Sequence, residues 1–178
     1  MSAHAIAEAL QRAEDVLRKR PAAGLHGDAP ATAIWHGDTR VVAHHANGTQ
    51  VPTDMPGEFG GTGDQVSPGW LFRAGVAACA NVSIAMLAAR EGVVLERLEV
   101  RVDSQSDSRG MLGLPEADGT PVSAAPRALQ MHVDIRAPGV APDALRALVE
   151  RGCARSPIPC AVQAALPLTL HIEAATGH

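Results

Sequence analysis

The feature that most constrains the fold of this chain is a long run of small and apolar residues at its centre. Residues 70–89 read WLFRAGVAACANVSIAMLAA and contain one charged side chain, Arg73. Ser67 is a favourable helix N-cap, and Pro68 suits the first helical position because its φ angle is fixed. We therefore predict one helix over 68–91, roughly 36 Å long at about 1.5 Å per residue.

A helix of this composition is apolar nearly all round, so protein must cover both of its sides. One chain of 178 residues covers a single side more easily than two, whereas a homodimer covers both. Arg73, Asn81, Ser83 and the many alanines make a buried helix a better interpretation than a membrane span. We expect a homodimer and no membrane partner.

The composition also narrows the classes of function. The length predicts one domain that can bury a real core. A net charge of −4, with two Trp, two Phe and no Tyr, argues against binding of nucleic acid or carbohydrate. Three cysteines are too few for a disulfide framework, and no apolar signal region follows Met1, so a cytoplasmic location is expected. The richness in Ala, Gly and Pro is typical of GC-rich bacterial genomes.

Hydrophobic periodicity and turn residues predict alternating helices and strands in the rest of the chain. The expected elements are a helix over 3–19, extended pieces at 32–35 and 40–44 with a hairpin turn at Asn47-Gly48, strands at 98–103 and 129–136, a helix over 142–152, a short helix opened by Ser156-Pro157, and a last strand at 168–172. This order predicts an α+β fold with a mostly antiparallel sheet packed on the long helix. The domain is expected over 25–178, with an N-terminal amphipathic helix over 1–24. The polar connection over 104–126 is long enough to be functional.

Two polar motifs are weak candidates for chemistry. The glycine loop at 60–63 lacks the Lys-Ser/Thr of a phosphate-binding P-loop, so a flexible lead-in to the helix is the better interpretation. His44 and His45 are adjacent, so on a strand they face opposite sides and cannot share a metal ion. The sequence predicts no metal site and no cofactor.

The cysteines are better candidates. Cys79 lies about three turns into its helix, beyond the reach of that helix's own dipole, so a nearby cation would be needed to hold it as a thiolate. Cys160 falls in the first turn of the short helix opened by Pro157, where free backbone N–H groups favour a thiolate. From the residues alone, Cys79 as a buried structural thiol and Cys79 as a redox thiol both stay open.

Several motifs occur in a characteristic order. They are Gly60-Gly61, Ser67-Pro68-Gly69-Trp70-Leu71, Ala77-Ala78-Cys79, Ala154-Arg155-Ser156-Pro157-Ile158 and Leu168-Thr169-Leu170. Their order and spacing resemble the OsmC/Ohr family of thiol proteins over about residues 31–174. The resemblance implies an α+β fold in which two chains intertwine around a pair of long central helices.

The resemblance also implies roles for single residues. Members of the family reduce organic hydroperoxides with a peroxidatic cysteine, and a second cysteine followed by proline resolves the sulfenic acid. Cys79 matches the peroxidatic position. The second cysteine falls on Ser156, the family's glutamate on Gly69 and its arginine on Gly37.

Other residues are therefore candidates for the missing roles. Cys160 is the candidate resolving thiol, and Arg109 and Arg40 are candidate cations for the thiolate. The expected function is thiol-dependent reduction of organic hydroperoxides in the oxidative stress response through Cys79, supported by an unknown thiol reductant or by Cys160. The alternative is a non-catalytic OsmC-like protein that binds a small apolar ligand at the dimer interface.

Overall fold

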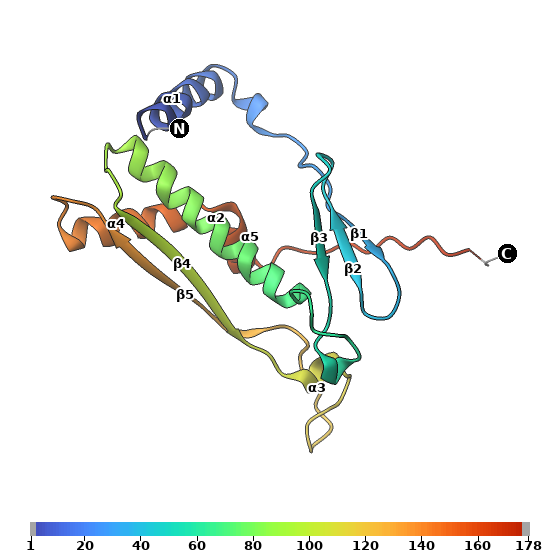
Figure 1. Ribbon diagram of the computed structural model, residues 1–178. Coiled ribbons are helices and arrows are strands. Elements are labelled where there is room, and N and C mark those ends of the chain that lie inside the picture. Colours follow the sequence, from blue (N-terminus) through green and yellow to red (C-terminus); the bar gives the residue numbers. More distant parts are fainter. Residues whose placement is uncertain (1–2, 176–178) are drawn as a thin grey trace.

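The computed structural model describes residues 3–175. Helix α2 (Pro68–Arg90) lies at its centre (Figure 1). The Ser67 side chain accepts a hydrogen bond from the Trp70 backbone N–H, and Pro68 occupies the first turn. The predicted helix and its cap are thus confirmed. By length and composition α2 could cross a membrane, but the core helix of a soluble protein passes the same test, and α2 packs against the core of this domain.

The remaining elements form an α+β arrangement with two antiparallel sheets, as the sequence predicts. The helices are α1 (Ala3–Lys19), α3 (Ser108–Met111), α4 (Pro142–Cys153) and α5 (Pro157–Ala164), with 3-10 turns η1 (Pro21–Gly24) and η2 (Gly57–Phe59). The strands β1 (Thr32–Trp35), β2 (Val41–His44) and β3 (Gln50–Thr53) form one sheet in that order, and β4 (Arg97–Gln105) pairs with β5 (Arg127–Arg136) in the other. The predicted hairpin at Asn47-Gly48 joins β2 to β3.

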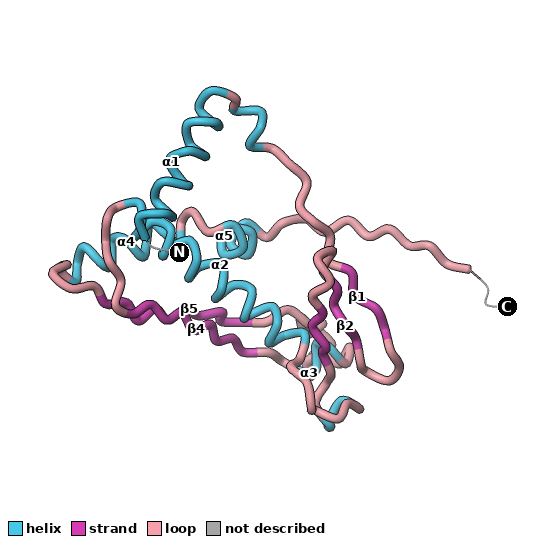
Figure 2. Tube along the Cα trace, turned by 45° about the horizontal axis from the view of Figure 1, so that its top comes forward, coloured by secondary structure: helices cyan, strands magenta, loops and turns pink. Residues whose placement is uncertain are grey.

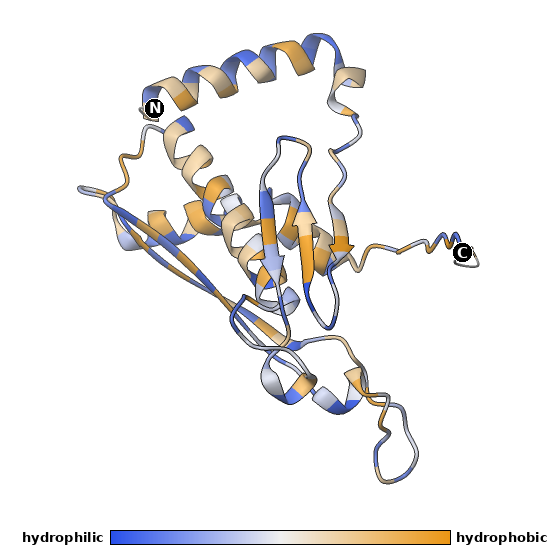
Figure 3. Cartoon of the chain, turned by 45° about the vertical axis from the view of Figure 1, so that its right-hand side comes forward, coloured by the Kyte–Doolittle hydropathy of each residue, from blue (hydrophilic) through white to orange (hydrophobic). Residues whose placement is uncertain are grey.

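The core lies where α2 meets the β4–β5 sheet and α4. Hydropathy alternates along β4 and β5 (Figure 3), so one face of the sheet, with residues such as Val100 and Val133, packs on the helices. Ile84 and Leu148 are fully buried between α2 and α4. Gly152 allows this close approach, because a Cβ at that position would lie 2.8 Å from Ile84 Cγ1 and 3.0 Å from Ile84 Cα.

Helix α1 lies over the C-terminal half of α2 (Figure 2). Glu14 of α1 forms an ion pair with Arg90 in the last turn of α2. Leu10 of α1 lies near Met86 and Leu87 of α2, where the three side chains border a cleft. The predicted N-terminal amphipathic helix is therefore present, and it packs on the central helix.

The glycine loop before α2 is tied down by the buried Asp54, which replaces the flexible lead-in expected from the sequence. The Asp54 carboxylate accepts hydrogen bonds from Thr39 Oγ1 and from the backbone N–H groups of Met55 and Thr62. These donors, Thr39 first, hold the pKa of Asp54 well below its ordinary range. A Cβ on Gly61 would lie 1.7 Å from the Met55 carbonyl oxygen, so only glycine fits there.

The predicted last strand at 168–172 is wrong for this chain. Residues 166–175 run as an extended segment outside both sheets and away from the body of the molecule (Figure 1). Leu168, Leu170 and Ile172 are largely exposed. A β-strand needs a hydrogen-bonded neighbour, and the described part of this chain supplies none to the segment.

The close contact at Gly152 gives a first prediction. Gly152→Ala should lower the free energy of unfolding, because overpacking against Ile84 costs about 1–3 kcal/mol. This cost exceeds the gain of about 1 kcal/mol that alanine brings to a helix interior. Urea unfolding at one fixed protein concentration measures the difference. Gly27→Ala, where a Cβ meets nothing within 4 Å, is the matched control and should change stability by less than about 0.5 kcal/mol. Equal stability of the two variants would contradict the packing argument.

Candidate active site

Cys79 lies half-buried in the middle of α2 and faces the turn between α4 and α5. The Ser156 hydroxyl donates a hydrogen bond to Cys79 Sγ at 3.2 Å. The backbone N–H of Ile158 donates to the same sulfur at 3.4 Å. Two donors from one short segment thus converge on the thiol of the central helix.

The N-terminus of α5 explains this geometry. Ser156 is the N-cap of α5, but its hydroxyl caps no backbone N–H of its own helix and is directed to Cys79 instead. Pro157 follows and has no N–H, so Ile158 supplies the first N–H of the helix. Free N–H groups at a helix N-terminus carry partial positive charge and favour negative charge on a nearby sulfur. The arrangement therefore aims one hydroxyl and one helix-terminal N–H at Cys79 Sγ.

The sequence analysis placed the free N–H groups of this helix at Cys160, whereas the structure directs the first of them to Cys79. The backbone N–H of Cys160 bonds to the Ser156 carbonyl, inside the helix. Cys160 Sγ is directed to the Ala154 carbonyl oxygen at 3.5 Å and the Cys153 carbonyl oxygen at 4.0 Å. The first free N–H of α5 points at Cys79, a contact between residues 79 positions apart in sequence.

Cys153 is half-buried at the end of α4. Its Sγ lies 3.9 Å from Met131 Sδ, at the contact between α4 and β5. Burial raises the pKa of the Cys153 thiol, and the neighbouring Cys160 acts in the same direction. All three cysteines are free thiols.

The two arginines named as candidate cations are held by carboxylates of their own loops. Arg109 forms ion pairs with Asp107 and Glu116 beside α3, and its hydrogen bond lowers the pKa of Asp107 to about 2. Arg40 pairs with Asp64 at 2.8 Å in the glycine loop. Within residues 3–175, neither guanidinium has a hydrogen bond to Cys79. Both remain hypotheses as thiolate partners.

The positions to which the resemblance assigns the family's arginine and glutamate are glycines here, Gly37 and Gly69. Gly37 has a φ of +101°, in a turn that favours glycine, and a Cβ there would meet nothing. Gly69 is in the first turn of α2, where a Cβ would lie 3.7 Å from Arg73 Nη1. Arg73 donates to Ser104 Oγ at 3.3 Å and was not singled out from the sequence, because one arginine in an apolar helix is not distinctive.

An apolar cavity of about 200 Å³ lies between α2, the β4–β5 sheet and α5. Val76 stands one helical turn before Cys79, and Pro159 follows the residue whose N–H bonds to the thiol. Leu129 and Met131 of β5 form the opposite wall. Helices α2 and α5 therefore contribute both to the surroundings of the thiol and to the lining of this cavity.

The sequence matches a known family over the part that carries this site. The family model for OsmC-like proteins matches residues 61–171, which include α2, Cys79 and the α4–α5 turn. The match spans more than half of the chain. The chain belongs to the OsmC-like protein family. No curated protein matches the sequence significantly.

Solved structures of the family share this fold. An OsmC-like protein from Mycoplasma pneumoniae is 18% identical with a TM-score of 0.64, covering 78% of this chain and 89% of its own. An organic hydroperoxide resistance protein OsmC from Legionella pneumophila is 23% identical with a TM-score of 0.55, covering 78% and 91%. One from Elizabethkingia anophelis is 20% identical with a TM-score of 0.53, covering 78% and 90%. The resemblance inferred from the sequence is confirmed at the level of family and fold.

The short contact between Ser156 and Cys79 gives a second prediction. Ser156→Cys should form a disulfide with Cys79 after one equivalent of hydrogen peroxide, because the two side-chain atoms already lie 3.2 Å apart. Intact mass should fall by two hydrogens, and tandem mass spectrometry should locate the bridge at 79–156. Ser156→Ala is the matched control and should show no such bridge. Free thiols that persist at positions 79 and 156 in oxidised Ser156→Cys would show that the two side chains do not face each other as described.

The environment of Cys153 gives a third prediction. Iodoacetamide should alkylate Cys153 more slowly than Cys79 and Cys160 in the folded protein at neutral pH. Its rate should rise only in more alkaline solution, because burial raises the pKa of this thiol and alkylation requires the thiolate. A time course followed by peptide mass spectrometry gives the three rates, and the urea-unfolded protein is the control. Equal rates before unfolding would contradict the buried environment of Cys153.

Proposed function

We propose that this OsmC-like protein reduces organic hydroperoxides through the thiolate of Cys79, as part of an oxidative stress response. The observation that carries the proposal is the convergence of Ser156 Oγ and the Ile158 N–H on Cys79 Sγ. The names of the solved relatives from Legionella pneumophila and Elizabethkingia anophelis, both hydroperoxide resistance proteins, support the same class of reaction.

The reaction at Cys79 is a two-electron transfer to the peroxide. The thiolate attacks one peroxide oxygen, an S–O bond forms and the O–O bond breaks. The alkoxide takes up a proton and leaves as the alcohol, while the sulfur becomes a sulfenic acid. The apolar cavity bordered by Val76 and Pro159 offers space for the alkyl or aryl group of the peroxide.

Return to the thiol needs a second sulfur. Ser156 cannot form a disulfide, so the proposal assigns this role to an external thiol. That thiol forms a mixed disulfide with Cys79 and releases water, and a second thiol frees Cys79. Cys160 is the alternative resolving thiol, although its Sγ is directed to the carbonyls of Cys153 and Ala154. Free thiols of this kind fit a reducing compartment such as the bacterial cytoplasm.

A second copy of the chain is the proposed cover for the apolar residues that one chain leaves exposed. On α2, Trp70 is 49% and Val82 57% exposed. In the C-terminal segment, Leu168 is 94% exposed and has no strand to pair with among residues 3–175. Exposed large apolar side chains on the central helix and on the C-terminal segment fit burial against a partner, so a homodimer is the proposed state.

Peroxide consumption tests the proposal. The purified protein with cumene hydroperoxide and dithiothreitol should consume peroxide well above the uncatalysed rate, and Cys79→Ser should remove the excess. Ser156→Ala should slow the reaction about tenfold or more, since a hydrogen bond to a charged group contributes about 1.5–3 kcal/mol. Cys160→Ser is the matched cysteine control and should keep the rate when dithiothreitol is the reductant. Equal turnover by the wild type and Cys79→Ser would overturn the proposal.

The second candidate function is binding of a small apolar ligand without turnover. It is favoured by the apolar cavity of about 200 Å³ and by glycines at the two positions, Gly37 and Gly69, where the family has charged residues. Native mass spectrometry of the purified protein distinguishes the two. A retained ligand together with no peroxide consumption supports binding, whereas fast turnover without a retained ligand supports the peroxidase.

A further inference from the structure

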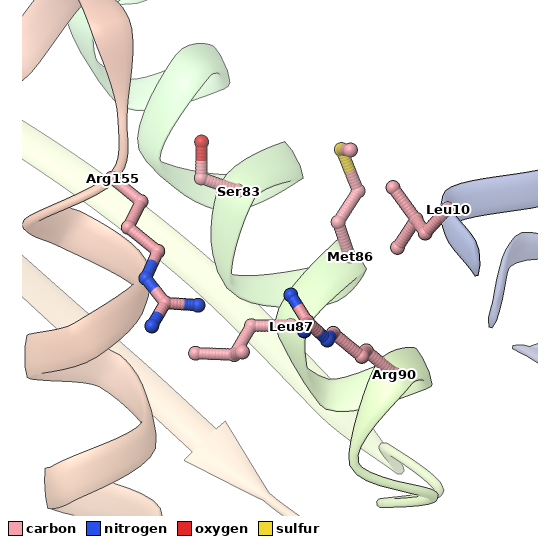
Figure 4. Close-up of a pocket in the computed structure, with 6 residues that line it drawn as sticks. All are labelled: Leu10, Ser83, Met86, Leu87, Arg90 and Arg155. Carbon is pink, nitrogen blue, oxygen red and sulfur yellow. The ribbon is translucent and has the colours of Figure 1, made fainter. Parts of the chain in front are cut away.

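A second cleft, of about 140 Å³, lies between helix α1, the C-terminal half of α2 and the α4–α5 turn. Figure 4 shows its lining, which comes from three separate parts of the chain: Leu10 of α1, Ser83, Met86, Leu87 and Arg90 of α2, and Arg155 of the α4–α5 turn. The proposed reaction uses none of these side chains.

The charges in this cleft are positive. The guanidinium groups of Arg155 and Arg90 enter the cleft from opposite walls, with Leu87 between them (Figure 4). Arg90 is paired with one carboxylate, Glu14. Arg155 has no side-chain hydrogen bond or ion pair with any residue in the described range 3–175. The cleft therefore holds one arginine charge in excess of its acidic partners.

The rest of the lining is apolar apart from one hydroxyl. Leu10, Met86 and Leu87 supply aliphatic or thioether surface, and Ser83 contributes the hydroxyl. An apolar cavity of about 150 Å³ accommodates a benzene molecule, so this cleft suits a ligand of roughly that size. Arginine binds carboxylates through two parallel N–H···O hydrogen bonds. An anionic head with a small apolar body matches both parts of the lining.

We propose that this cleft is a binding site for a small organic monocarboxylate. Arg155 binds the carboxylate, Arg90 adds positive charge from the opposite wall, and α1 closes over the apolar body of the ligand through Leu10. The site goes beyond the proposed peroxide reduction, because none of its residues contacts the thiol. Ser83 lies one helical turn after Cys79, so the two sites are neighbours along α2.

Benzoate and its uncharged isostere benzamide test the charge requirement. Titration of the full-length protein with each, followed by two-dimensional amide NMR at neutral pH, should give saturable shifts around 83–90 and 155 for benzoate. Benzamide should bind at least about tenfold more weakly, since the charge-assisted hydrogen bonds contribute about 1.5–3 kcal/mol. Added salt should weaken benzoate binding, as expected for charges at the surface.

Single substitutions test the residues. Arg155→Gln should weaken benzoate binding about tenfold. Arg146→Gln, which removes an exposed arginine of α4 outside the cleft, is the matched control and should bind benzoate like the wild type. Glu14→Gln should strengthen binding, because it removes the carboxylate that competes for Arg90. Far-UV circular dichroism verifies that each variant is folded.

Three outcomes would overturn the proposal: no saturable benzoate shifts, equal binding of benzoate and benzamide, or wild-type affinity in Arg155→Gln. Cys79→Ser separates this site from the proposed reaction. It should lose peroxide consumption and still bind benzoate. If the wild-type protein binds benzoate but does not consume peroxide, the result supports the benzoate site and counts against the proposed reaction. If it consumes peroxide but does not bind benzoate, the result supports the reaction and counts against the benzoate site.

Discussion

The packing of α4 against α2 at Gly152 and Ile84 is the contact on which the site depends. Because Gly152 has no side chain, the end of α4 reaches the backbone of α2 itself. The chain then turns within a few residues and begins α5 at Ser156, which is fully buried. This short connection leaves Ser156 and Ile158 within hydrogen-bond distance of Cys79, which precedes Ile84 by about one and a half turns of the same helix. A wider spacing between the helices would separate the donors from the sulfur.

A consequence for the chemistry is that the hydrogen-bond donors to Cys79 Sγ within residues 3–175 are neutral groups and not charged side chains. The resemblance to the family assigns an arginine and a glutamate to the positions of Gly37 and Gly69, and the sulfur here receives one hydroxyl and one backbone N–H instead. A backbone N–H at a helix N-terminus is fixed by the fold and needs no reorganisation when charge develops on the sulfur. The partial charge at a helix end is about half a unit, which is less than the full charge of a guanidinium.

Much of the fold could be predicted because it is encoded locally. The N-cap Ser67, the first-turn Pro68 and the apolar run specify α2, and the alternation along 98–103 and 129–136 specifies β4 and β5. The prediction of a last strand was wrong for the opposite reason. The apolar residues at 168–172 do alternate, but a strand requires a hydrogen-bonded neighbour, and none is present among the residues that the structure describes. The contact between Ile158 and Cys79 could not be predicted from either segment, since it depends on how closely α4 packs on α2. Arg155 was visible beside Ser156, but only the packing of α1 and α2 places it in a cleft.

In the proposed reaction, Ser156, at the position where the resemblance to the family places a second cysteine, changes which oxidised state the site can reach. A cysteine at that position would trap the sulfenic acid of Cys79 at once as an internal disulfide, which protects it from further oxidation. A serine at 3.2 Å can donate a hydrogen bond to the sulfur but cannot form the bridge. The sulfenic acid must then wait for a thiol from outside, and its lifetime depends on how well the surrounding protein excludes excess peroxide. A second copy of the chain that covers the exposed side of α2 would help to exclude excess peroxide from the sulfenic acid. The exposed apolar surface and the serine at position 156 therefore both call for a partner chain.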